Sequence, residues 1–123
     1  DGILVQRQIV GQELLIGVKK DAQFGPLVVA GMGGIFTEVF KDVARALVPV
    51  DADEAGSMLK SLRLFPLLKG ARGQKGVHLP AVEQVIVRVS KMIQEHPEIT
   101  ELDLNPVIAT SDGCWAVDCR IIL

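Results

Sequence analysis

The sequence predicts an α+β domain in which helices cover one face of a largely antiparallel sheet. Apolar, β-rich runs occupy both ends of the chain, and two segments with helical spacing, 51–62 and 81–95, lie between them. Strands and helices do not alternate as strictly as a parallel βαβ sheet requires. The chain has 123 residues, of which 49% are hydrophobic and 23% charged, so its size and composition fit one folded domain.

Four strands are expected in the first half of the chain, at 3–10, 13–18, 27–30 and 43–50. Gly11-Gln12 separates the first two strands and is typical of a hairpin turn. The polar segment 19–26 ends in Gly25-Pro26 and is interpreted as a loop. The short, continuous apolar run 27–30 predicts a strand buried on both faces.

The second half begins with the helix 51–62, for which either Asp51 or Asp53 can serve as N-cap. A long, basic, Gly-rich connection over 66–80 leads to the helix 81–95, which His96-Pro97 ends. Two strands at 101–109 and 114–123 close the chain, joined through the turn sequence 110–113.

Charge, hydropathy and cysteine content exclude several classes of protein. Thirteen basic and 15 acidic side chains give a net charge of −2, whereas a general nucleic-acid binder needs a basic stripe. No apolar run approaches the roughly 18–20 residues of a membrane span. Cys114 and Cys119 match no zinc spacing, and on one strand they could not easily pair, which favours a reducing, cytoplasmic location. We therefore expect neither a nucleic-acid nor a membrane partner.

The last predicted hairpin carries the residues best suited to chemistry. Period-two alternation places Asp103 and Asn105 on one face of their strand. A four-residue turn would pair Asn105 with Asp118, and a two-residue turn would pair it with Arg120. In either register these four side chains share a face. Two carboxylates and an amide oxygen suit Mg²⁺ held together with phosphates. A solvated sheet face with an Asp–Arg pair is the alternative, and it stays open at this point.

Three other features have simpler structural interpretations. The glycines of 31–34 can bring backbone N–H groups close to an anion, but they match neither the P-loop nor G-x-G-x-x-G, so a tight turn is favoured. The cationic segment 69–76 can close over phosphates or remain an exposed loop. His78 and His96 flank the second helix and are interpreted as surface or capping residues. Trp115 is expected in the core.

Five ordered motifs resemble one family: Gln23-Phe24-Gly25-Pro26-Leu27-Val28, the run 31–43 from Gly31-Met32-Gly33-Gly34 to Val43, Pro66-Leu67-Leu68-Lys69-Gly70-Ala71-Arg72-Gly73, Glu101-Leu102-Asp103-Leu104-Asn105-Pro106 and Ala116-Val117-Asp118-Cys119-Arg120. Their order is similar to that in the ATP-grasp domain of ADP-forming acyl-CoA (acetate–CoA) synthetases, relatives of the succinyl-CoA synthetase β subunit. The resemblance covers nearly the whole chain and implies the carboxy-terminal part of that domain. The amino-terminal subdomain would precede Asp1, so the isolated piece is expected to be inactive.

The resemblance also implies a reaction and a set of site residues. In this family, acyl-CoA, ADP and phosphate interconvert with acid, CoA and ATP through a phosphohistidine that a CoA-binding domain or subunit carries. The Mg²⁺ ligands of the family match Asn105 and Asp118, and the acidic residue that orients the phosphohistidine matches Asp103. Glu13 corresponds to the residue that binds the ribose of ATP or ADP. The residues that would meet adenine are Gln6, Arg7, Gln8 and Ile9.

The chain departs from the family pattern at two positions. The family usually has an arginine where this chain has Ala46, one step after Arg45, and on a strand that change reverses the face. It usually has an acidic residue where His78 stands. These departures leave open a second interpretation, a regulatory domain that senses nucleotide or acyl-CoA within an acetyltransferase fusion. The resemblance implies that the acyl group is chosen in the CoA-binding part, so this chain does not specify it.

Overall fold

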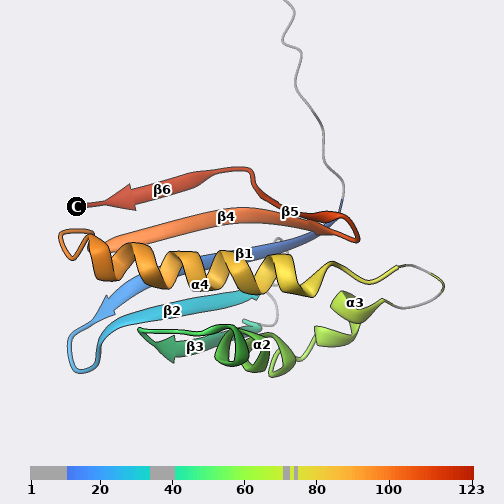
Figure 1. Ribbon diagram of the computed structural model, residues 1–123, viewed down its shortest axis with the longest axis horizontal. Helices are drawn as coiled ribbons and strands as arrows, with labels where there is room; N and C mark the ends of the chain where they lie inside the picture. Colours follow the sequence, from blue (N-terminus) through green and yellow to red (C-terminus); the bar gives the residue numbers. More distant parts are fainter. Residues whose placement is uncertain (1–10, 34–40, 71–72, 74) are drawn as a thin grey trace, which may run out of the picture.

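Within the part that the computed structural model describes (residues 11–33, 41–70, 73 and 75–123), an antiparallel sheet carries helices on one face (Figure 1). The strands are β1 (Gln12–Asp21), β2 (Gly25–Met32), β3 (Val43–Leu47), β4 (Glu101–Thr110), β5 (Gly113–Ala116) and β6 (Cys119–Ile122). The helices are α2 (Ala52–Lys60), α3 (Phe65–Lys69) and α4 (Leu79–Glu95). The predicted α+β class and antiparallel sheet are confirmed.

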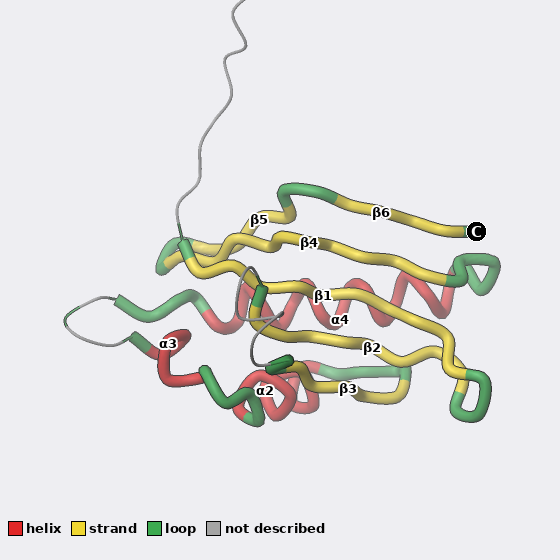
Figure 2. The backbone as a smooth tube through the Cα atoms, turned by 180° about the vertical axis from the view of Figure 1, so that it is seen from behind, coloured by secondary structure: helices red, strands yellow, loops and turns green. Residues whose placement is uncertain are grey.

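The strand order is β3-β2-β1-β4, with β5 and β6 following one another along the outer edge of β4. Helices α4 and α2 pack on the same side of this sheet, and Figure 2 shows the strands from the opposite side, where no described helix covers them. We call the two sides the helix face and the open face. No helix among the described residues has the length and apolar character needed to cross a membrane.

The core lies between the sheet and α4. Alternate residues of β1 and β2 point into it, and Ile16 and Val28 are fully buried. From the helix, Val82 and Ile86 are equally buried, as expected for an amphipathic helix. Each such side chain contributes about 1.5–3 kcal/mol through its removal from water. Burial of this apolar stripe therefore fixes which face of the sheet is left open.

Helix α2 begins where the sequence predicts, whereas α4 begins at Leu79, two residues before the predicted start at 81. The Asp51 carboxylate Oδ1 accepts the Glu54 N–H at 2.8 Å and caps α2. At α4, His78 Nδ1 accepts the Ala81 N–H at 3.1 Å. His96 ends α4 and lies 3.4 Å from Glu98. Both histidines are exposed, so their interpretation as surface or capping residues is confirmed.

The predicted loop 19–26 is wrong at both ends. Residues 19–21 continue β1 and Gly25 begins β2, so that only three residues, 22–24, form the turn. The Asp21 carboxylate accepts the N–H groups of Gln23 and Phe24, and Gly25 takes a φ of +78°, which glycine adopts without strain. Strand β2 is also not buried on both faces, because Val29 on the open face is only half-buried.

Further differences concern element boundaries. Strand β3 ends at Leu47 rather than at residue 50, and the short helix α3 occupies the start of the connection predicted over 66–80. The buried carboxylate of Asp42 accepts the N–H groups of Arg63 at 2.7 Å and Leu64 at 2.9 Å, which ties the start of β3 to the segment before α3. The predicted strand 3–10 lies outside the described residues. Both cysteines are free thiols.

Candidate functional site

A row of cross-strand neighbours crosses the open face. The pairing sets Arg45 on β3 beside Val29, Val29 beside Gly17, Gly17 beside Asp103, and Asp103 beside Arg120. Directly opposed residues project from the same face of a sheet. The prediction that Asp103 and Arg120 share one face is therefore confirmed, and the row extends to three further strands, β1, β2 and β3.

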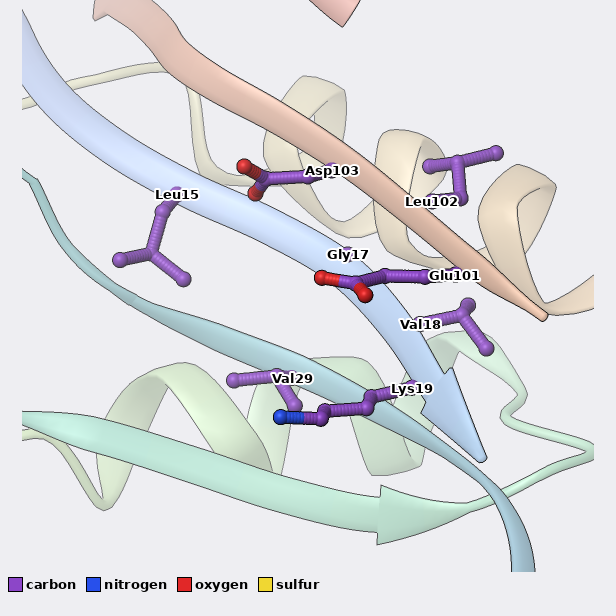
Figure 3. A pocket seen from close by; sticks show the side chains of 8 residues that line it. All are labelled: Leu15, Gly17, Val18, Lys19, Val29, Glu101, Leu102 and Asp103. Carbon is purple, nitrogen blue, oxygen red and sulfur yellow. The ribbon is translucent and has the colours of Figure 1, made fainter. Parts of the chain in front are cut away.

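The seam between β1 and β4 is closed tightly beneath Asp103. A Cβ atom at Gly17 would lie 2.4 Å from the Leu102 carbonyl oxygen and 3.4 Å from the Asp103 Cα atom. Figure 3 shows the Glu101 carboxylate over β1 next to Gly17, and the Asp103 carboxylate extending from β4 towards β1. Since glycine adds no side chain, the hollow above this seam stays open and has the two carboxylates at its rim.

A β-bulge in β4 lies next to this hollow. Leu14 pairs with Val107 and Ile16 with Leu104, so that Leu15 alone faces two residues, 105 and 106. An extra residue of this kind reverses the alternation of a strand. It explains why Val107 is fully buried although it has the same parity as Asp103. The bulge thus lets one strand supply Asp103 to the open face and Val107 to the core.

The predicted metal ligands meet where the neighbouring strand is also interrupted. The segment expected to be one strand over 114–123 is divided between β5 and β6. At the break, the Asn105 N–H donates to the Asp118 carbonyl oxygen at 3.3 Å. The structure therefore brings Asn105 and Asp118 together, as one of the two predicted registers requires.

The turn between β4 and β5 shows that the second predicted register, Asn105 opposite Arg120, does not occur. Thr110 pairs with Gly113, which leaves a turn of two residues, 111 and 112. This turn belongs to the register that joins Asn105 to Asp118, whereas Arg120 is opposite Asp103. The expectation that a two-residue turn would bring Arg120 opposite Asn105 is wrong. The Thr110–Gly113 pair continues the ladder in which Ala109 pairs with Cys114, so it shortens the turn without changing the register.

The donor set at this break fits a hard cation shared with phosphates. Asn105 and Asp118 are exposed, and Asp118 Oδ1 accepts the Cys119 N–H at 2.9 Å, which orients the carboxylate and leaves Oδ2 available. Carboxylate and amide oxygens are ligands that Mg²⁺ prefers. No group of three or more His, Cys, Asp or Glu side chains in the described ranges could hold a metal. Such an ion would need water or phosphate oxygens as well.

Glu13 lies on the same strand as Gly17, near the beginning of β1. It is exposed and pairs with Ile108, and its carbonyl oxygen accepts the Gly33 N–H at 2.8 Å. At about 3.3 Å per residue, Glu13 and Gly17 are separated by roughly 13 Å along the strand. The residues assigned to adenine, Gln6, Arg7, Gln8 and Ile9, lie outside the described residues.

The glycine cluster 31–34 is described as far as Gly33, and Gly31 and Gly33 allow neighbouring segments to pack closely. The tight turn predicted over 31–34 is wrong at its start, because Gly31 and Met32 belong to β2 and pair with β1. A Cβ atom at Gly31 would lie 2.6 Å from the Asp42 carbonyl oxygen, so this glycine allows close packing against the chain before β3; Gly34 lies outside the described residues. Trp115 is half-buried and opposes Ile108 on the open-face side, so the expectation that it belongs to the core is wrong. Lys19 and Arg45 also lie on the open face, and the sequence had placed Lys19 in a loop.

The sheet, its single helical layer and the carboxylates on its open face define the class of protein. A family model described as the ATP-grasp domain matches residues 1–123. The chain belongs to the ATP-grasp domain family, and the recognition made from its motifs is confirmed.

Two proteins with sequences similar to this chain are ADP-forming acid–CoA ligases. The chain is 42% identical over 123 residues to the β subunit of ADP-forming acetate–CoA ligase I from Pyrococcus furiosus, covering 99% of this chain and 53% of that protein. It is 41% identical over 123 residues to the ADP-forming 4-hydroxybutyrate–CoA ligase of Nitrosopumilus maritimus, covering 98% of this chain and 18% of the relative. The chain thus spans about half of the one relative and less than a fifth of the other.

A solved structure shows the same fold. Acetyl-coenzyme A synthetase 1 from Ca. Korarchaeum cryptofilum, in complex with coenzyme A and Mg-AMPPCP, superposes with a TM-score of 0.90 at 43% identity. The match covers 94% of this chain and 55% of that chain, and the phosphohistidine segment of that protein points towards its nucleotide-binding site.

Proposed function

We propose that this chain is the carboxy-terminal, nucleotide- and Mg²⁺-binding part of the ATP-grasp domain of an ADP-forming acyl-CoA synthetase. The observation that carries the proposal is the meeting of Asn105 and Asp118 at a shared strand break, beside the seam where Asp103 is opposite Gly17. The relatives named above support it, since they are ADP-forming ligases and one binds Mg-AMPPCP.

The whole protein would interconvert acyl-CoA, ADP and phosphate with acid, CoA and ATP. Its partner would be a CoA-binding domain or subunit that carries the phosphohistidine, as the phosphohistidine segment of the Korarchaeum protein suggests. The remaining part of the ATP-grasp domain would complete the nucleotide site, in line with the 53% of the Pyrococcus subunit that the chain spans. The two free thiols fit a cytoplasmic location.

Each site residue has a defined task in this proposal. Glu13 would accept hydrogen bonds from the ribose hydroxyls, and Gln6, Arg7, Gln8 and Ile9 would meet adenine. The strand then leads from the ribose towards Gly17, where the triphosphate would end. Asn105 and Asp118 would hold Mg²⁺, which when bound neutralises charge on the phosphate oxygens and aligns them.

Asp103 would position the phosphoryl acceptor. Its carboxylate would accept a hydrogen bond from one ring N–H of the incoming histidine, which leaves the other ring nitrogen unprotonated and directed at the γ-phosphorus. That nitrogen forms the new N–P bond while the bond from the γ-phosphorus to the β–γ bridging oxygen breaks, and ADP departs. The reverse step makes ATP from ADP.

The test uses the parent protein and separates chemistry from binding. We expect Asp103→Asn to lower the transfer of ³²P from [γ-³²P]ATP to the histidine by at least roughly 100-fold, because misplacement of the acceptor has that cost. Nucleotide affinity should stay unchanged. Asp118→Asn should instead weaken Mg²⁺-dependent nucleotide binding. Asp112→Asn, in the exposed β4–β5 turn, is the matched control.

Three outcomes would contradict the proposal. If Asp103→Asn lost ATP binding and phosphotransfer together, Asp103 would be a binding or structural residue. Unchanged metal affinity in Asp118→Asn would remove that side chain from the metal site. Rapid ATP formation by residues 1–123 alone would contradict the proposed division of the ATP-grasp domain.

A further inference from the structure

Beyond Asp103, the open face continues into a second hollow that the proposed chemistry does not use. It encloses about 250 Å³ and is lined by Lys19, Lys20, Asp21, Leu27, Val29 and Arg45. Lys19 and Val29 also line the hollow beside Asp103, so the two hollows adjoin. Figure 3 shows the Lys19 side chain directed across the sheet towards Val29 on β2.

Two of the cations in this second hollow are free to bind an external anion. Lys19 opposes Glu101 across the β1–β4 seam, yet neither Lys19 nor Arg45 forms an ion pair with any acidic side chain of the described part. In contrast, Lys20 Nζ donates to the Pro97 carbonyl oxygen at 2.6 Å, and the Asp21 carboxylate accepts two N–H groups in its own turn. Positive charge therefore remains on Lys19 and Arg45.

The surface between these cations is apolar. Leu27 and Val29 form a half-buried floor, and Leu47 lies in the same cross-strand row as Lys19 and Leu27 with 51% of its area exposed. A free inorganic anion would gain nothing from this floor. A polypeptide segment that carries both acidic and aliphatic side chains would contact the cations and the apolar surface together.

The position of this surface relative to the proposed nucleotide site indicates which segment it receives. Along β1 the order is Glu13, Gly17 and then Lys19, two residues further from the ribose contact. At about 3.3 Å per residue, Lys19 lies roughly 7 Å beyond the Asp103 row. An in-line acceptor must approach the γ-phosphate from the side opposite ADP, which is the side of Lys19. Arg45 lies level with Asp103, on β3 at the far end of the same row.

We propose that Lys19, Leu27, Val29, Arg45 and Leu47 form a docking surface for the acidic, aliphatic segment that flanks the acceptor histidine. This inference rests on the proposed function and adds to it the chemistry of the partner segment. Lys19 and Arg45 are positioning residues: they hold the segment so that its histidine reaches Asp103, and they do not contact the nucleotide.

The test is single-turnover phosphorylation of the histidine in the full parent synthetase, with saturating [γ-³²P]ATP at low ionic strength. We expect the double charge reversal Lys19→Glu/Arg45→Glu to slow phosphotransfer by about 10-fold or more, since reversal replaces attraction with repulsion. ATP affinity should not change, and added salt should narrow the difference. Lys19→Arg/Arg45→Lys should retain the rate, as should the matched control Lys60→Glu/Lys91→Glu on exposed helix positions.

Three results would overturn the inference. A wild-type rate in the double reversal, while Asp103→Asn still blocks transfer, would reject the docking surface and leave the proposed function intact. An equal loss of ATP affinity and rate would make Lys19 and Arg45 nucleotide ligands instead. A wild-type protein that neither binds ATP nor forms phosphohistidine would overturn both this inference and the proposed function.

Discussion

The helix face and the open face of the sheet are made by alternate residues of the same strands, yet they have opposite properties. On β1, Leu14 and Ile16 are fully buried beneath α4, whereas Glu13 and Lys19 on the other face are exposed. The buried residues of β1 on the helix face, Leu14, Ile16 and Val18, are all apolar, and the open face combines carboxylates, cations and a glycine. The comparison teaches that one set of side chains determines the fold and the other is available for binding, so substitutions can separate the two.

The largest expected effect comes from the helix face. Ile16→Ala should lower the free energy of unfolding by about 2–5 kcal/mol, because it leaves a cavity in a fully buried site. Leu15→Ala, the half-buried neighbour on the open face, should have less than half that effect. Urea unfolding of both variants measures the contrast. Equal losses would show that the open face also belongs to the core.

Gly17→Ala should affect both the stability of the fold and the function of the open face. The added Cβ would meet the Leu102 carbonyl oxygen at 2.4 Å, so β1 and β4 must separate beneath Asp103. We expect a loss of about 1–3 kcal/mol in unfolding free energy, as for other overpacked sites, together with slower phosphotransfer. Gly56→Ala on α2 is the control, since its Cβ would meet only the flexible end of Glu83. A wild-type rate in Gly17→Ala would contradict the close seam.

A smaller effect is expected where a polar group supports the helix face. The buried Ser90 hydroxyl accepts the Val50 N–H at 2.8 Å. Ser90→Ala leaves that N–H without its acceptor, so unfolding free energy should fall by about 1–2 kcal/mol. Ser57→Ala at an exposed position of α2 should change it little. Thermal unfolding of both would test this, and no difference between them would show that water satisfies Val50.

The smallest expected effect concerns the two thiols. Burial raises the pKa of the Cys114 thiol, so less thiolate is present at any given pH. Cys119 is exposed. A thiol reagent at pH 8 should therefore modify Cys119 first, and raising the pH should accelerate modification of Cys114. Mass spectrometry of partly modified protein measures the order, and preferential modification of Cys114 would contradict it.

Local patterns predicted much of the fold and part of the site. The Asp51 cap, the two long helices and the shared face of Asp103 and Arg120 follow from periodicity and capping chemistry. Strand alternation also predicts that Arg45 and Ala46 lie on opposite faces of β3. In the structure Ala46 packs against the core and Arg45 is exposed.

Other features depend on contacts between distant segments. Lys19 and Lys20 have the polarity of a loop, but the ladders to β2 and β4 keep them in β1. The bulge at 105–106 depends on how β4 pairs with β1, which alternation within β4 alone does not reveal. For the same reason the docking surface could not be predicted, because Lys19 and Arg45 meet only through the register of three strands.

The pairing of β1 with β4 has a consequence for how the molecule assembles. Strands β1, β2 and β3 are neighbours in sequence as well as in the sheet, and so are β4, β5 and β6. Among the described strands, only the β1–β4 ladder pairs one group with the other, through residues as far apart as Gln12 and Ala109. Closing so long a loop is entropically costly and slow compared with forming local hairpins. The seam beneath Asp103 should therefore form late in folding, after each group of strands has paired internally.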